Sequence, residues 1–274
     1  MSATLILFPL AGAVSLVAAW LLWARALDRP LPTKEPQPLI ATCVSISLFF
    51  TLIGAIGAAP SSPLGIRFTL IDAAASASFL VQLIYLIGLL RHGIHGLGMI
   101  LLPVTGLALI LTPLLPTGHR GSWLETDSWL EASHLALSMS AYAVATLSAL
   151  HAVMHLLLDR ALKAKRIHPL IRAMPPLTDI ERHMFAQVRG ALWLLGAGIL
   201  TGLSWQWVAW GHFALLSHKV LLSFLAWILL LIIALAHRRG SWRNKTSSYL
   251  VIGTYLTMLL AYFGSRFIMA ELHP

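Results

Sequence analysis

The sequence contains very little cysteine and few charged residues. Its 274 residues include one cysteine, Cys43, and only 11% of them are charged. A single cysteine excludes an intrachain disulfide and a CxxC pair, so the chain does not itself pass electrons through a dithiol. Soluble domains carry about 25% charged residues. The low charge, together with 58% hydrophobic residues, therefore excludes an ordinary soluble domain.

Long hydrophilic segments are missing as well. The longest inner-face connection, residues 159–185, is too short for a soluble domain, and the sequence contains no internal repeat. Paired apolar segments interrupted by Gly and Pro, which mark many secondary transporters, are also missing. Because no segment offers a nucleophile with an acid–base pair, we predict that the chain is not an enzyme.

The sequence does contain a series of apolar segments separated by short polar ones. A helix that crosses a bilayer needs about 20 mainly apolar residues, and eight segments come near that length. They are residues 3–24, 38–59, 69–90, 96–115, 133–157, 188–210, 216–236 and 247–268. We therefore predict an all-α, polytopic membrane protein, with a single transmembrane domain over residues 1–274 built from about eight helices.

Basic residues are distributed unevenly between the two sides of these segments. Successive connections between spanning segments lie on opposite sides of the membrane. With the connections assigned in this way, fifteen of the nineteen Lys and Arg residues fall on one side. By the positive-inside rule this side is cytoplasmic, which places both termini outside and indicates a multi-pass protein of a bacterial-type inner membrane. The formal net charge of +9 then fits the anionic inner leaflet. Membrane lipid, and not nucleic acid, is the expected partner of the basic residues.

Histidines are frequent for a membrane protein, with twelve in the chain. His134 and His273 lie on the predicted outer face, whereas His155 and His237 end apolar segments on the inner face. A neutral imidazole is a good ligand for haem iron, and two histidines from different helices can hold one haem between them. The alternative is that each histidine is only interfacial, solvated at the headgroups or bonded to a helix-end carbonyl.

Three tryptophans occur together at the outer end of the sixth apolar segment. Trp205, Trp207 and Trp210 stand in the stretch GLSWQWVAWGHF. Tryptophans at this depth are typical of the aromatic belt at a membrane interface. The alternative is a flat apolar platform for a large planar ligand such as a porphyrin.

Four stretches follow one another in an informative order. His134 is followed by AYA at residues 141–143; WGHF is followed by His218-Lys219; His237 ends the next apolar segment; and YFG precedes a final LH that contains His273. Over residues 130–274 this order resembles the cytochrome c assembly family, the haem-handling membrane proteins of CcsA type and their shorter HemX and YpjD-type relatives. The stretches MPPLTDIERHMF and AYFGSR are most similar to the YpjD-type branch.

The resemblance implies a site for haem b, bound without covalent attachment. His134 and His273 would be the axial ligands of its iron at the outer face, and Lys219 and Arg266 would face the propionates. The further cofactor-binding residues implied are Trp205, Trp207, Trp210, His218 and His237. A second haem between membrane histidines would involve His237 and His155.

The function that follows is haem binding in cytochrome c biogenesis, in a handling, accessory or regulatory role. The tryptophan-rich segment of the haem-delivering members has an Asp-Pro pair that AWGHFALLSHKVLLSFLAW lacks, so catalysis of attachment is not expected. Haem and other cytochrome c assembly components, or another membrane protein, are the expected partners. Two alternatives stay open: a non-haem membrane protein that stabilises a partner, and an ion or small-solute transporter that uses Asp72. A structural salt bridge between Asp72 and Arg67 would equally explain an acidic residue in an apolar segment.

Overall fold

The chain divides into two compact units. In this computed structural model the first unit comprises Met1–Leu124 with Leu157–Leu177, and the second comprises Glu125–Leu156 with Thr178–Pro274. The structure describes residues 4–31, 36–58, 66–68, 70–92, 96–115, 122–124, 128–165, 171–172, 174–214, 216–239 and 245–261. The second unit largely coincides with the region 130–274 that carries the family resemblance, and the single domain over residues 1–274 stays a prediction.

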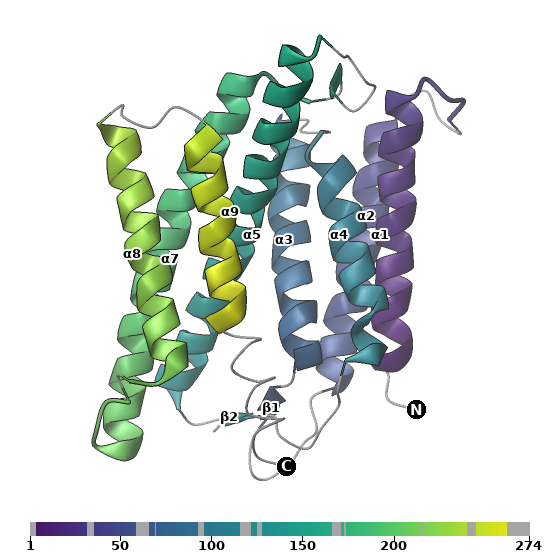
Figure 1. Ribbon diagram of the computed structural model, residues 1–274. Helices are drawn as coiled ribbons and strands as arrows, with labels where there is room; N and C mark the ends of the chain where they lie inside the picture. The colour runs from purple at the N-terminus through teal and green to yellow at the C-terminus, as the bar shows by residue number, and fades with distance from the viewer. Residues whose placement is uncertain are drawn as a thin grey trace. The chain divides into compact units, whose positions relative to one another are not determined.

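The first unit is a bundle of four helices. They are α1 (Thr4–Ala26), α2 (Pro36–Ala58), α3 (Leu70–His92) and α4 (Gly98–Ile110), after which the 3₁₀ turn η1 covers Thr112–Leu114. Consecutive helices run antiparallel and α4 returns to pack against α1, as in an up-and-down bundle (Figure 1). A short antiparallel pair, β1 (Ile66–Phe68) and β2 (Ser122–Leu124), is a feature that the sequence did not predict.

A hydrogen-bonded polar cluster lies inside this bundle. Gln82 of α3 donates from Nε2 to Ser15 Oγ at 3.3 Å and to Thr105 Oγ1 at 3.0 Å, and its Oε1 accepts from Ser47 Oγ at 2.9 Å. All four side chains are buried. Because they come from four different helices, the cluster fixes the four helices in one register.

Glycine allows two of these helices to touch backbone to backbone. A Cβ built on Gly12 of α1 would lie 2.5 Å from the Gly106 carbonyl oxygen of α4, and one on Gly106 would lie 3.0 Å from the Gly12 carbonyl oxygen. Only glycine permits so close an approach, which is typical of helix contacts in membranes.

The second unit is built from four further helices of the described residues. They are α5 (Trp129–Lys163), which continues past Leu156 into the first unit, α7 (Leu177–Trp210), α8 (His218–Arg238) and α9 (Lys245–Leu259). Tyr142 and His155 of α5 contact Met258 and Ser248 of α9 respectively, so α5 and α9 run antiparallel. By the same reasoning α7 is antiparallel to both α5 and α8.

The core of the second unit is formed by small residues of α5 against larger ones of its neighbours. Ala141, Ala145 and Ala152 of α5 are buried with Phe185 of α7 and Leu230 of α8. Inside a membrane the hydrophobic effect does not drive helices together, so their association depends on close packing, which small side chains permit. This close approach positions the functional groups of α5 against the backbone of α7.

The predicted all-α membrane fold is confirmed. A helix stands at each of the eight predicted segments, and six of them in the described part of the chain are long and apolar enough to cross a membrane. Helix α4 has 13 residues and a length of about 20 Å, because Pro113 lies in the turn that follows it. Helices α5 and α7 have 35 and 34 residues, about 50 Å each, and exceed the ~30 Å hydrocarbon core.

Candidate functional site

His134 lies near the beginning of α5, where this helix packs against the last third of α7. Its Nδ1 is 2.7 Å from the carbonyl oxygen of Gly198. One turn further along α7, Gly202 faces the imidazole ring: a Cβ at Gly202 would lie 2.7 Å from Cε1 and 2.8 Å from Nδ1. The ring therefore rests on bare helix backbone, half-buried at the end of the second unit that is predicted to face outside.

The contact with Gly198 fixes which ring nitrogen carries the proton. A carbonyl oxygen can only accept a hydrogen bond, so Nδ1 is the donor. In the neutral imidazole the lone pair then belongs to Nε2. A histidine that ligates a metal is held in just this way, with its other N–H given to a carboxylate or a backbone carbonyl. His134 thus has the bonding pattern of a metal ligand.

The three tryptophans do not share one face of α7. With about 100° between successive residues, Trp205 lies within about 60° of both Gly198 and Gly202, whereas Trp207 lies at least about 140° away from both. The Trp205 and Trp210 rings meet edge to face, with centroids 5.2 Å apart. The Trp207 ring is instead stacked on Phe213, at 5.1 Å.

This division separates the two interpretations of the tryptophans. Trp205 is on the side of α7 that contacts His134, and its ring packs against that of Trp210. Trp207 is 56% exposed on the opposite side, together with the exposed Phe213. The arrangement of Trp207 and Phe213 is that of an interfacial aromatic belt. Trp205 therefore lies on the His134 side of α7, while its ring partner Trp210 is itself 52% exposed.

The other predicted site residues of this end begin α8 or lie beyond the described chain. His218 is the first residue of α8, Lys219 follows it, and both are exposed. Ser217 caps the helix, accepting a hydrogen bond from the Val220 N–H at 3.4 Å. Since α5 begins, α7 ends and α8 begins at the same end of the antiparallel unit, these residues are on the His134 side. His273 and Arg266 lie outside the described residues.

His237 lies at the opposite end of the second unit. With a rise of 1.5 Å per residue, it is about 28 Å along α8 from His218, so it cannot share a metal with His134. Its ring is stacked on that of Phe185, with centroids 3.6 Å apart and an angle of 13° between the rings. His237 thus belongs to a separate group of polar side chains at the predicted inner face.

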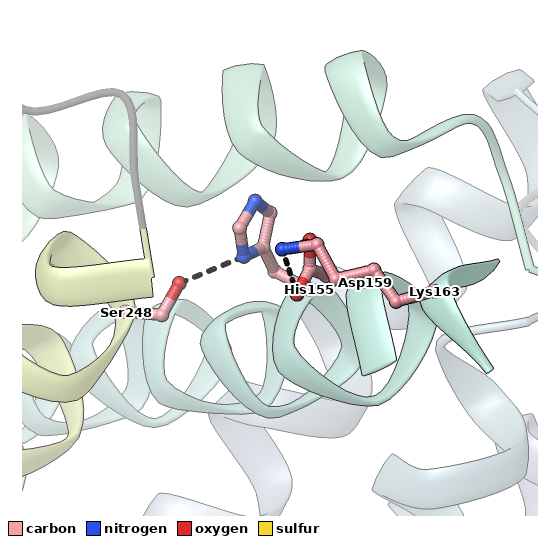
Figure 2. Close-up of polar contacts among 4 residues, drawn as sticks. All are labelled: His155, Asp159, Lys163 and Ser248. Atoms are coloured by element: carbon pink, nitrogen blue, oxygen red, sulfur yellow. Dashed lines mark hydrogen bonds and ion pairs between the residues drawn. The ribbon is translucent and has the colours of Figure 1, made fainter. Parts of the chain in front are cut away.

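Other histidines of α5 lie at this inner end. His155 is buried, and its Nδ1 is 3.0 Å from Ser248 Oγ on α9, as Figure 2 shows. Asp159 and Lys163 follow at one-turn intervals on α5 and form an ion pair of 2.9 Å. His151, also buried, faces His183 of α7 with ring centroids 5.8 Å apart. Among the described residues, no three His, Cys, Asp or Glu side chains converge to hold a metal ion.

Asp72 is the acidic residue at the beginning of helix α3. It lies in the first turn of α3 and is half-buried. A carboxylate there interacts favourably with the positive end of the helix dipole. The Arg67 side chain, its predicted partner, lies outside the described part of the structure, although the Arg67 backbone pairs with that of Trp123.

A comparison with known families decides the relationship. The sequence model of the family described as cytochrome C assembly protein matches residues 36–273, which is most of the chain. The chain belongs to the cytochrome c assembly protein family. The resemblance inferred from the sequence is therefore confirmed for this multi-pass membrane protein.

Curated relatives of this cytochrome c assembly protein include three bacterial proteins. The chain is 28% identical over 176 residues to the inner membrane protein YpjD of Escherichia coli K12, a match over 62% of the chain and 65% of YpjD. It is 33% identical over 156 residues, or 57% of the chain, to an uncharacterized 28.8 kDa protein of Azospirillum brasilense, covering 55% of that protein. Protein HemX of Brevibacillus brevis is 29% identical over 132 residues, 48% of either chain. The chain thus aligns with only about half to two thirds of each relative's length.

Sequence reasoning did not single out the residues that hold His134. Gly198 and Gly202 are spaced by one turn in the stretch LLGAGILTGL, and this spacing was the available signal. Ser248, the partner of His155, and His183, beside His151, were also not anticipated. A serine or a histidine within an apolar helix has no sequence mark that tells which neighbouring helix it meets.

Proposed function

We propose that this cytochrome c assembly protein binds haem b without covalent attachment at the outer face, and that His134 and His273 would hold it. The observation that carries the proposal is the bond of 2.7 Å from His134 Nδ1–H to the Gly198 carbonyl, which leaves Nε2 as a ligand. Trp205 and Trp210 supply apolar surface beside it. The haem would supply a redox-active iron or a transferable cargo.

The role that fits best is handling, regulation or accessory support of cytochrome c biogenesis, without catalysis of haem attachment. Cys43 is the only cysteine of the sequence, so the reactive thiols of a thioether-forming step must come from a partner. Lys219 at the start of α8 and Arg266 are the cations that we propose face the haem propionates. Other cytochrome c assembly components are the proposed partners, in a bacterial inner membrane.

The test is the reduced-minus-oxidised visible spectrum of the detergent-purified protein with added haemin, in the wild type and in His134→Ala. The matched control is His212→Ala, because His212 lies at the same end, is exposed, and likewise donates from Nδ1 to a carbonyl, that of Trp210, at 2.9 Å. A bis-imidazole spectrum that His134→Ala abolishes and His212→Ala preserves is the expected result.

Two further variants make the result decisive. His134→Met keeps a ligand of a different type, so it should retain haem with a shifted spectrum, which also shows that the site is folded. His273→Ala should lose the spectrum as His134→Ala does. Wild-type protein that stays colourless after haemin is added would overturn the haem assignment and leave the family relationship as one of scaffold only.

A further inference from the structure

The carbonyl that fixes His134 also receives a second side chain. Thr201 Oγ1 lies 3.1 Å from the Gly198 oxygen and 3.0 Å from the Ala197 oxygen, so its single proton is shared between the two carbonyls. The Gly198 oxygen is therefore approached by the Thr201 hydroxyl and by His134 Nδ1–H together. The Gly202 N–H bonds the same oxygen within the helix, so three donors share two lone pairs and each weakens the bonds of the others.

We propose that Gly198, Thr201 and Gly202 are positioning residues that set the ligand strength of His134, a role that rests on the proposed haem site. Gly198 accepts the Nδ1 proton, Gly202 leaves the space that the ring occupies, and Thr201 moderates the hydrogen bond. Hydrogen bonding from Nδ1–H makes the imidazole more basic and a stronger donor to ferric iron. The three residues act through His134 and do not need to touch the haem.

The space at Gly202 sets the first expected effect. In Gly202→Ala the new Cβ would lie less than 3 Å from two ring atoms, so the imidazole must move and its bond to Gly198 must lengthen. We expect haem affinity to fall about 10–100-fold, the range for loss of an outer partner of a metal ligand. The reduction potential should rise, because the weakened imidazole stabilises ferric iron less.

Replacing Thr201 should change the reduction potential in the opposite direction. In Thr201→Val one competing donor is removed without a change of shape. The Gly202 N–H of the helix and His134 Nδ1–H then share the Gly198 oxygen, so the His134 bond strengthens and His134 becomes a stronger ligand. The ratio of ferric to ferrous haem affinity should rise about threefold, which lowers the potential by about 28 mV for one electron. A purely structural role predicts no such opposition between Gly202→Ala and Thr201→Val.

Helix α9 offers a matched control for each change. A Cβ on Gly253 meets nothing within 4 Å, and Thr257 Oγ1 donates to the Gly253 carbonyl at 3.0 Å, the same kind of one-turn bond. Gly253→Ala and Thr257→Val repeat the chemistry of the test variants away from His134. They should leave haem affinity and potential unchanged.

The proton on His134 can be measured without haem. The ¹⁵N spectrum of the histidine-labelled apo protein, assigned with His134→Gln, should show a hydrogen-bonded Nδ1–H in the wild type, a weaker bond in Gly202→Ala and a stronger one in Thr201→Val. An Nε2–H tautomer for His134, or equal spectra for all three proteins, overturns the proposal even if haem binds. If haem fails to bind while these shifts occur, only the proposed function fails.

Discussion

The two units of the molecule bury polar groups of different kinds. In the first, the described buried polar side chains are hydroxyls and one amide, centred on Gln82. In the second, they include the imidazoles of His151 and His155. Hydroxyl and amide groups only hydrogen-bond, whereas an imidazole also has a ring nitrogen that can ligate a metal. The polar groups of the first unit suit a fixed scaffold, and those of the second suit chemistry.

Glycine shows the same difference. In the first unit Gly12 and Gly106 bring one helix backbone against another, whereas in the second Gly202 brings a helix backbone against an imidazole ring. The contact is equally close in both cases, but the partner differs. Filling the first space should therefore disturb folding, and filling the second should disturb a ligand.

The largest expected effect on stability is at the backbone contact of the first unit. In Gly12→Ala the new Cβ would lie 2.5 Å from the Gly106 oxygen and 2.8 Å from Ile110 Cγ1, so α1 and α4 must separate. We expect a loss of about 1–3 kcal/mol in the free energy of unfolding, the usual cost of overpacking. Unfolding in mixed detergent micelles measures it, with Gly253→Ala as the neutral control.

Hydrogen exchange then tests whether the two units respond separately. Faster exchange in Gly12→Ala should be confined to α1–α4, because local opening follows contiguous cooperative units. Equal acceleration in α8 and α9 would contradict the division. The haem spectrum proposed for the second unit should be unchanged in the fraction that folds.

A smaller loss is expected at the polar cluster of the first unit. Gln82→Leu removes three hydrogen bonds, each worth about 0.6 kcal/mol on average inside a membrane, so the cost should be about 1–2 kcal/mol. It should not be larger, because Ser15 and Ser47 keep backbone acceptors, the carbonyls of Leu102 and Ala11. The control is Ser45→Ala, an exposed serine bonded to the Ala41 carbonyl.

An unfolding free energy for Gln82→Leu equal to that of Ser45→Ala would show that the cluster does not fix the helix register. A loss of haem in Gln82→Leu would contradict the assignment of chemistry to the second unit alone.

The sequence predicts the positions of the helices but not the contacts between them. Apolar length and charge predicted the eight longer helices of the described residues, because in a membrane every spanning segment must satisfy its own backbone and exclude charge. The predicted apolar segments 133–157 and 188–210 are shorter than α5 at both ends and shorter than α7 at its beginning, because these helices continue into polar stretches where hydropathy gives no signal. The boundary of a helix and that of the membrane differ there.

The candidate site was predictable only in part. His134 was identified from its position and from the family resemblance, but its contact with Gly198 depends on the register of two antiparallel helices, which no local pattern encodes. The tryptophans illustrate the same limit. Their spacing alone shows that Trp205 and Trp207 face opposite ways on a helix, yet it does not show which of them faces α5.

The inner end of the second unit offers a test of the predicted second haem. His237 is stacked on Phe185 at 3.6 Å, and such ring pairs contribute about 0.5–1.5 kcal/mol. His237→Phe should keep the stacking and most of the stability, whereas His237→Leu should lose roughly that amount. Unfolding in mixed micelles compares the two variants.

The same pair of variants reports on haem content. A second haem held by His237 requires that both variants lose one haem equivalent, because neither phenylalanine nor leucine ligates iron. If haem content stays the same in both while only His237→Leu is destabilised, His237 is a packing residue and the outer site is the single haem site.

The smallest effect is expected at the serine that contacts His155. Ser248→Ala removes the contact of 3.0 Å with His155 Nδ1 and the longer one of 3.8 Å with Met184 Sδ, at a cost of about 0.6 kcal/mol. Ser204→Ala, exposed and bonded only along its own helix to Leu200, is the control. Although the energy is small, the imidazole of His155 is held by a hydroxyl that can donate or accept, whereas that of His134 is held by a carbonyl that only accepts. The ¹⁵N spectrum should therefore show a tautomer change at His155 in Ser248→Ala and none at His134, and a change at both would mean that the two ends of the unit are coupled.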